Sequence, residues 1–354
     1  MKFIHCADIH LDSKIEANLP SAKSKERKRE VLRSFLRLCE YAEKNGVTAV
    51  IIAGDLFDGE KISPVTRNAV LSEIADKGSV DFLYLCGNHD DAKPFGDAEL
   101  PDNLKLFKDS WVSYRYGKTV ITGAELTGEN YRSIYGGLCL KPDDINIVTM
   151  HGQVSSSVGE DCIVLNELAS HNIDYLALGH IHSYRESKLD GRGKWCYSGC
   201  LEGRGFDECG DKGFVMLEVD ENGVTSEFIK FNTRAVAEVE CDISGLSDFS
   251  DILKKIKVDT SHLDASSMVK VVLTGSVPTD AKKDVEYFAK ELSESFYFAK
   301  VKDSTRLEIN PEDYMYDISL KGEFIRLALS SGLDGEQLDR VIECGLAALK
   351  GMEV

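Results

Sequence analysis

KFIHCADIHLD, residues 2–12, runs an apolar segment directly into two aspartates and a histidine. Residues two apart in an extended chain project to the same side, so the side chains of Asp8 and His10 can point at one spot beyond the end of a strand. That arrangement suits a shared ligand. An aspartate at a strand end is also a common turn residue, so this stretch alone leaves both interpretations open.

Similar segments recur along the first 230 or so residues, each apolar and followed by polar residues. They lie at residues 48–55, 81–90, 118–126, 145–152 and 174–182. Short apolar runs bounded by turn residues are typical of strands that are buried on both faces. Helical patterns at 25–44 and 64–77 separate the first three of these strands, which indicates a layered α/β domain.

The pattern changes after residue 233, so we expect three segments. Residues 1–233 form the layered domain, 234–317 a small β-α-β-α-β domain, and 318–354 a C-terminal segment of two helices. The last helix carries apolar residues at helical spacing. This stripe predicts docking onto the protein's own domains, and a partner-binding face is the alternative.

The charge balance argues against a protein that coats nucleic acid, because 42 Lys and Arg stand against 60 Asp and Glu, for a net charge of -18. A local basic segment is nevertheless present at residues 21–37, with seven basic and two acidic residues. It is either a solvated helix face or a contact for a phosphate backbone.

The cysteines do not indicate a structural zinc site. The ten are scattered without a CxxC pair, and the spacing of Cys196, Cys200 and Cys209 does not match the usual zinc frameworks. No apolar stretch is long enough to cross a bilayer and the first residues do not resemble a signal peptide. We therefore expect a cytoplasmic protein that does not associate with membranes.

Five strand ends carry residues suited to metal binding, in the order DIH, GD, GNHD, HG and GHIH. They contain five of the eight histidines. His5, His171 and His262 fall outside them and are expected to be structural. Ligands and catalytic groups gather at strand ends in α/β sheets, so this order along the chain predicts proximity in space.

These motifs resemble the calcineurin-like metallophosphoesterase superfamily, whose pattern is D-x-H, G-D-x-x-D, G-N-H-D/E, H and G-H-x-H. The second motif stands here as GDLFD, with Asp55 and Asp58. The resemblance covers about the first 230 residues and implies an α/β/β/α sandwich with a small α+β capping domain and C-terminal helices. The opening DIHLD and the compact second domain are most similar to SbcD-type DNA repair exonucleases.

The resemblance implies a site for two divalent metal ions. One ion would be held by Asp8, His10, Asp55 and His182, and the other by Asp55, Asn88, His151 and His180. Mixed imidazole and oxygen ligands favour Mn, with Fe, Zn or Mg as alternatives, over Ca. The positive charge of two such ions exceeds the negative charge of the two carboxylates, Asp8 and Asp55. The site would therefore stay positive and attract a phosphate.

His89 would be the general acid by the same resemblance, with Asp90 as its orienting partner or as an ordinary turn residue. The implied function is a DNA exonuclease or endonuclease subunit in DNA repair, with an SMC-like coiled-coil ATPase as partner and a homodimer as a further expectation. Two alternatives remain: a small-molecule or cyclic-nucleotide phosphodiesterase or phosphatase, and a scaffold of the same fold without catalysis.

Overall fold

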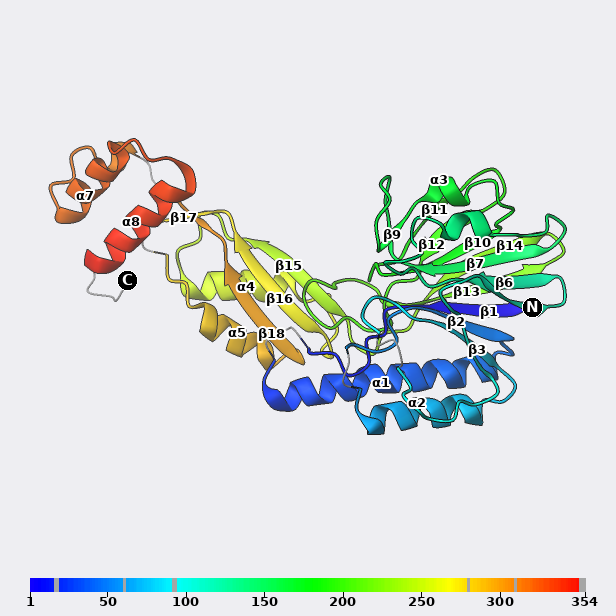
Figure 1. Ribbon diagram of the computed structural model, residues 1–354. Helices are drawn as coiled ribbons and strands as arrows, with labels where there is room; N and C mark the ends of the chain where they lie inside the picture. The colour runs from blue at the N-terminus through cyan, green and yellow to red at the C-terminus, as the bar shows by residue number, and fades with distance from the viewer. Residues whose placement is uncertain (16–18, 60–61, 91–93, 279–280, 309–310, 350–354) are drawn as a thin grey trace. The chain divides into compact units, whose positions relative to one another are not determined.

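A computed structural model describes residues 1–354 apart from 16–18, 60–61, 91–93, 279–280, 309–310 and 350–354. The chain divides into two compact units, residues 1–235 and 236–354 (Figure 1). No helix among the described residues is both long enough and apolar enough to cross a membrane.

The first unit contains two six-stranded sheets. The first has the order β14 (Gly223–Lys230), β13 (Gly213–Asp220), β1 (Lys2–Cys6), β2 (Ala49–Ala53), β3 (Asp81–Leu85), β4 (Leu104–Leu106). The second has the order β11 (Arg185–Lys188), β12 (Lys194–Tyr197), β10 (Tyr175–Gly179), β7 (Ile145–His151), β6 (Thr119–Gly123), β5 (Val112–Tyr116). β1 to β4 are parallel to one another, as are β6, β7, β10 and β12, and the edge strands β5, β11 and β14 are antiparallel to their neighbours.

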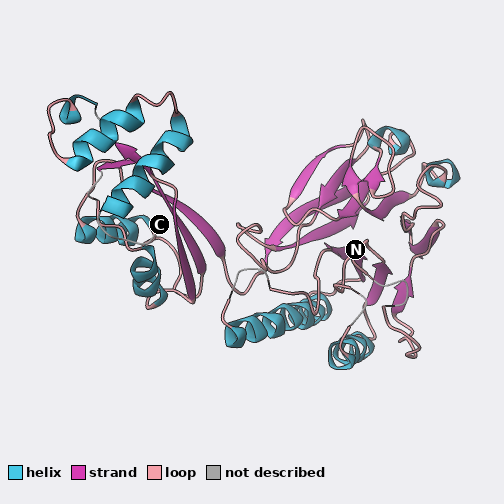
Figure 2. Cartoon of the chain, turned by 60° about the vertical axis from the view of Figure 1, so that its left-hand side comes forward, coloured by secondary structure: helices cyan, strands magenta, loops and turns pink. Residues whose placement is uncertain are grey.

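Helices cover the outer faces of both sheets (Figure 2). α1 (Ser21–Lys44) and α2 (Pro64–Asp76) pack on the first sheet, and η1 (Ile134–Gly137) and α3 (Leu165–Leu168) pack on the second. The short strands β8 (Gln153–Val154) and β9 (Cys162–Ile163) pair with each other. Ser63 begins α2 by accepting a hydrogen bond from the backbone N–H of Thr66 at 3.1 Å, with proline in the first turn.

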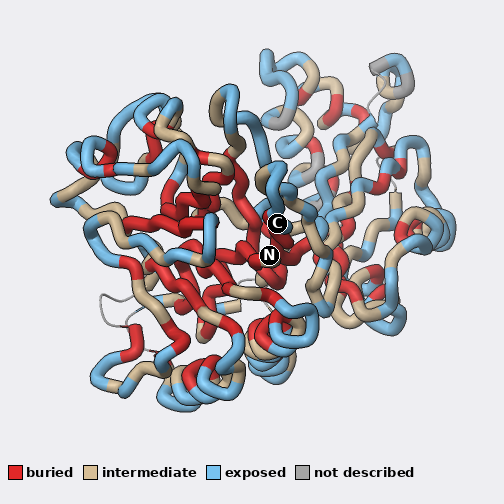
Figure 3. Tube along the Cα trace, turned by 90° about the vertical axis from the view of Figure 1, so that its right-hand side faces the viewer, coloured by how far each residue is buried: buried red, intermediate tan, exposed pale blue. Residues whose placement is uncertain are grey.

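Alternation along the buried strands builds two apolar layers. On β2, Ala49 and Ile51 face the second sheet, whereas Val50 and Ile52 face the helices. Every residue of this strand is therefore buried. Figure 3 shows buried residues in the interior and exposed residues mainly at the surface. The α/β/β/α sandwich expected from the sequence is confirmed.

The second unit has a parallel three-stranded sheet of β15 (Val236–Asp242), β16 (Met268–Thr274) and β18 (Phe298–Asp303). α4 (Phe249–Asp259) and α5 (Val285–Ser293) share its apolar core, and β17 (Ser276–Pro278) pairs with β19 (Arg306–Glu308). α6 (Pro311–Tyr314), α7 (Leu320–Leu329) and α8 (Gly335–Leu349) follow, and the last two form a separate cluster. The division into segments 1–233, 234–317 and 318–354 stays a prediction.

Candidate metal centre

The candidate site lies where β1, β2, β3, β7 and β10 end, and its residues leave the strands in an unusual backbone conformation. Asp8, His10 and Asp55 have φ angles of 52°, 50° and 53°. Left-handed φ angles are costly for side chains other than glycine and persist only where the surrounding structure holds them. Here the backbone N–H of Asp8 donates to Gly54 O at 3.1 Å, and that of His10 donates to Asp55 O at 2.9 Å.

Two glycines of the motifs leave room for neighbouring site residues. A Cβ on Gly54 would lie 2.1 Å from Nδ1 of His151, and a Cβ on Gly87 would lie 2.1 Å from Oδ1 of Asp55. Any larger residue would displace a site side chain. The G-D and G-N-H-D motifs thus include their glycines for steric reasons.

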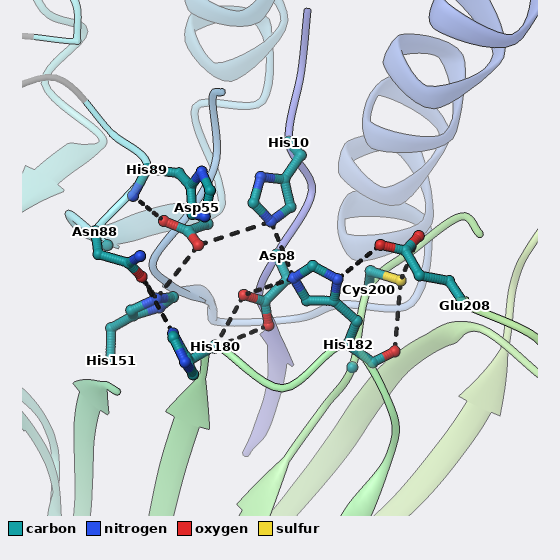
Figure 4. Close-up of polar contacts among 12 residues, drawn as sticks. Asp8, His10, Asp55, Asn88, His89, His151, His180, His182, Cys200 and Glu208 are labelled. Carbon is teal, nitrogen blue, oxygen red and sulfur yellow. Dashed lines mark hydrogen bonds and ion pairs between the residues drawn. The ribbon is translucent and has the colours of Figure 1, made fainter. Parts of the chain in front are cut away.

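One group of ligand atoms gathers around His10 and His182 (Figure 4). Their Nε2 atoms are 3.1 Å apart, Asp55 Oδ2 is 3.7 Å from His10 Nε2, and Asp8 Oδ1 is 3.9 Å from His182 Nε2. Two atoms that each lie about 2.1 Å from one metal ion are separated by about 3.0 to 3.4 Å. The separation of the two nitrogens fits a shared cation.

A second group gathers around Asn88. Its Oδ1 lies 2.9 Å from His151 Nε2 and 3.1 Å from His180 Nδ1. His151 Nδ1 donates to Ala53 O at 2.9 Å, so Nε2 is the ring nitrogen left to bind a metal. Asp55 Oδ2 lies 3.3 Å from His151 Nε2, which places this carboxylate between the two groups. All seven residues expected as ligands are brought together.

The charges at the site favour cation binding. Burial alone would lower the pKa of His151, but the Asp55 carboxylate outweighs burial and raises it to about 9 in the protein without metal. The same interaction holds the pKa of Asp55 below its ordinary value, although burial opposes this. A metal ion bound here would replace the proton of His151, so metal binding releases protons.

His89 is half-exposed beside the two groups, and its contact differs from the one expected. Its Nδ1 lies 3.1 Å from Asp58 Oδ1, an oxygen that also lies 3.4 Å from His10 Nδ1. Asp90 instead accepts hydrogen bonds from the backbone N–H groups of Phe57 at 2.8 Å and Gly87 at 2.9 Å.

The expectation that Asp90 orients His89 is therefore corrected, because its carboxylate is bound to the backbone of Gly87 in its own motif and of Phe57 in the GDLFD motif. Burial raises the pKa of Asp90 to about 6, although its hydrogen bonds to Gly87 and Phe57 lower it. Among the described residues, the carboxylate that reaches His89 is that of Asp58. Asp58 was visible in the GDLFD motif, but nothing in the spacing distinguished it from Asp90.

Sequence reasoning missed two further residues at the site, Arg204 and Glu208. Glu208 Oε1 lies 2.7 Å from His182 Nδ1, and Arg204 binds the same carboxylate. Both follow β12 in a segment without a recognised motif. A cavity of about 140 Å³ adjoins His89, lined by Lys14, Asp58, His89, Arg204, Gly205, Asp207 and Glu208.

Comparisons with known proteins extend over most of the chain. Residues 1–184 match the family described as calcineurin-like phosphoesterase. An uncharacterised metallophosphoesterase of Bacillus subtilis, YhaO, is 24% identical over 78% of this chain and 72% of its own length. The DNA double-strand break repair protein Mre11 of Haloferax volcanii is 25% identical over 98% of this chain and 75% of its own. A dimetal phosphatase structure from Danio rerio superposes with a TM-score of 0.44 at 13% identity, covering 65% of this chain and 99% of that one.

Proposed function

The chain belongs to the calcineurin-like phosphoesterase family, as its motifs predict, and from this premise we propose that it is a two-metal phosphodiesterase that hydrolyses DNA. The observation that carries the proposal is the convergence of two groups of ligand atoms on Asp55, whose Oδ2 lies 3.7 Å from His10 Nε2 and 3.3 Å from His151 Nε2. A carboxylate in this position can bridge two cations.

The proposed ligands are the seven residues expected from the sequence. Asp8, His10, Asp55 and His182 would hold one ion, and Asp55, Asn88, His151 and His180 the other. Mixed nitrogen and oxygen donors favour Mn, with Fe, Zn or Mg as alternatives. Bound cations supply Lewis-acid activation of the phosphate and of the attacking water.

His89 is the proposed general acid. Its side chain is half-exposed and can reach a substrate, and its Nδ1 lies 3.1 Å from Asp58 Oδ1. This contact would orient the ring. In the proposal, the other ring nitrogen of His89, Nε2, delivers a proton to the leaving oxygen of the phosphodiester.

DNA is the proposed substrate for two reasons. The relative from Haloferax volcanii, whose name describes DNA double-strand break repair, aligns over 98% of this chain. In addition, α1 presents Lys25, Arg29 and Arg33 to solvent, and among the described residues these three make no ion pair or side-chain hydrogen bond. An unpaired basic face on a chain of net charge -18 suits a phosphate backbone.

A partner ATPase of the SMC-like coiled-coil class is part of the proposal, as is a homodimer. The segment around α7 exposes large apolar side chains, with Tyr316 86%, Ile318 99% and Leu320 70% exposed. Exposed apolar patches of this kind mark interaction surfaces. A cytoplasmic location also belongs to the proposal, because the ten cysteines are free.

The test is nucleotide release from end-labelled linear DNA by protein stripped of metal, with and without added Mn²⁺. We expect release that requires Mn²⁺ and is lost in Asp55→Ala, because that variant removes the bridging carboxylate. Release that is equal with and without metal, or is unchanged in the variant, would contradict the proposal. Thermal unfolding of the variant controls for its folding.

A small-molecule phosphodiesterase or phosphatase is the second candidate. It is favoured by the small cavity of about 140 Å³ beside His89, which would hold a compact leaving group. An aryl phosphodiester assay separates the two candidates. A DNA enzyme gains strongly from the polymer, whereas a small-molecule enzyme hydrolyses the aryl diester at least as well as DNA.

A further inference from the structure

One segment, residues 200–212, holds His182 on two sides. Glu208 Oε1 accepts a hydrogen bond from Nδ1–H of the His182 ring at 2.7 Å. The backbone carbonyl of His182 accepts hydrogen bonds from Lys212 Nζ at 2.6 Å and from Cys200 Sγ at 3.5 Å. Figure 4 shows Glu208 and Cys200 beside His182. We propose that Glu208 is a positioning residue for the metal ion that His182 would bind.

Glu208 is itself fixed and buried. Its side chain is 4% exposed, and Arg204 donates to it from its backbone N–H at 2.7 Å and from Nη2 at 2.7 Å. Burial alone would raise the pKa of Glu208, but the hydrogen bonds from His182 and Arg204 hold it below its ordinary value. Because Nδ1 is engaged by the carboxylate, Nε2, the atom that faces His10, is the ring nitrogen left to bind a metal.

Among the described residues, the other three imidazoles proposed as ligands make no hydrogen bond of this kind to a carboxylate. His151 Nδ1 donates to a neutral carbonyl, and His180 Nδ1 faces Asn88, which is itself a proposed ligand. His10 Nδ1 lies 3.4 Å from Asp58 and makes no hydrogen bond within the described structure. A carboxylate bound to the far nitrogen fixes an imidazole's tautomer and raises its basicity as a ligand.

The two proposed metal positions should therefore differ in their dependence on Glu208. The ion at His10 and His182 relies on a ring that Glu208 orients. The ion at Asn88, His151 and His180 does not. Losing a partner of this kind costs about 10- to 100-fold in metal affinity, and here the loss should fall on one of the two ions.

Glu202 provides a matched control within the same segment. It is 2% exposed, and it accepts hydrogen bonds from Ser34 Oγ and from the backbone N–H of Thr233, both at 2.6 Å. It contacts none of the proposed ligands among the described residues. Glu202→Gln therefore disturbs the same buried segment without touching His182.

The experiment is a calorimetric titration of the metal-stripped full-length protein with Mn²⁺, together with metal analysis after dialysis. We expect two ions bound to the wild type, and in Glu208→Gln a loss of about 10- to 100-fold in affinity for one ion with the other unchanged. Glu202→Gln should bind both ions as the wild type does and unfold at a lower temperature in EDTA. Arg204→Met, which leaves Glu208 in place, should weaken the same ion by a smaller factor.

A Glu208→Gln isotherm identical to that of the wild type would overturn the inference, as would equal weakening of both ions or the same loss in Glu202→Gln. If Glu208→Gln fails to fold, the Arg204→Met isotherm decides in the same way. The inference takes one point from the proposed function, namely that the site binds two metal ions, and it does not depend on the substrate. Two ions bound without nucleotide release would count against the DNA substrate alone.

Discussion

His5 lies between the two sheets, where its Nδ1 is 3.0 Å from the Tyr175 hydroxyl and its Nε2 is 3.2 Å from Leu178 O. Burial lowers its pKa from 6.5 to about 3. Below pH 6.5 the unfolded chain therefore binds a proton that the folded chain does not, so the free energy of unfolding falls as pH falls from about 6.5 to about 3.

We expect His5→Gln to flatten this slope, because glutamine does not titrate. Urea denaturation at a series of pH values, followed by tryptophan fluorescence, measures it, since Trp111 and Trp195 both belong to the first unit. An unchanged slope in His5→Gln would contradict the prediction.

His89 gives a second prediction at this scale. His89→Gln should retain both metal ions and lose about 10² to 10⁴ in the rate of DNA hydrolysis, because the leaving alkoxide no longer receives a proton. An aryl diester with an acidic leaving group should lose far less. Initial rates on the two substrates, with metal analysis of the variant, check this. Equal losses on both substrates would mean that His89 does not act as the acid.

At the scale of one element, α1 divides its charges between two faces. Arg27 is fully buried and paired with Glu30 and Glu202, and Arg234 binds Glu30 from the other side. The acidic residues of the basic segment, Glu26 and Glu30, both pair with Arg234. The exposed face is left with Lys25, Arg29 and Arg33, which are four residues apart and so lie in a row.

We expect the triple variant Lys25→Glu, Arg29→Glu, Arg33→Glu to bind duplex DNA more weakly and with a salt dependence about two to three units shallower on a log-log plot. A control triple variant reverses three exposed charges elsewhere on the first unit and changes the net charge equally: Lys108→Glu, Lys118→Glu, Lys141→Glu. Fluorescence anisotropy at several salt concentrations compares them. Similar slopes for the two triples would exclude a specific phosphate contact by α1.

The same helix shows what the sequence could not reveal. The basic run was visible, but the burial of Arg27 depends on Glu202 and Gly203, which are 175 and 176 residues away in the sequence. Periodicity gives the apolar face of a helix and cannot identify an arginine that has a carboxylate partner inside the protein. A long-range ion pair of this kind leaves no local pattern.

At the scale of the whole molecule, the two units have separate apolar cores, and the candidate metal centre belongs to the first. Metal binding should therefore stabilise one unit and not the other, by about 2.7 kcal/mol at a free metal concentration one hundred times Kd. We expect Mn²⁺ to raise the midpoint of the fluorescence transition and to leave a second transition, seen by far-UV circular dichroism, in place. A single transition that shifts as a whole would contradict independent units.

Much of the sandwich and of the candidate site could be predicted, because each strand end can be recognised in the sequence as an apolar run followed by a polar motif. Asp55 and His151 are 96 residues apart, yet the parallel strands bring them together. The partners of His89 and His182 could not be predicted. The sequence does not show whether Asp58 of the GDLFD motif or Asp90 of the GNHD motif contacts His89. Glu208 reaches His182 through a segment whose path is set by tertiary contacts.

The positive φ angles at Asp8, His10, Asp55 and His180 have an evolutionary consequence. Each costs the folded chain about 1 to 2 kcal/mol, a cost that glycine at the same position would not incur. Substitution of one of these residues by glycine would relieve that strain but remove a proposed metal ligand, whereas any other residue would keep the strain. In a lineage where hydrolysis is no longer under selection, we expect the motif residues to be substituted first, while the residues of the sandwich core are retained.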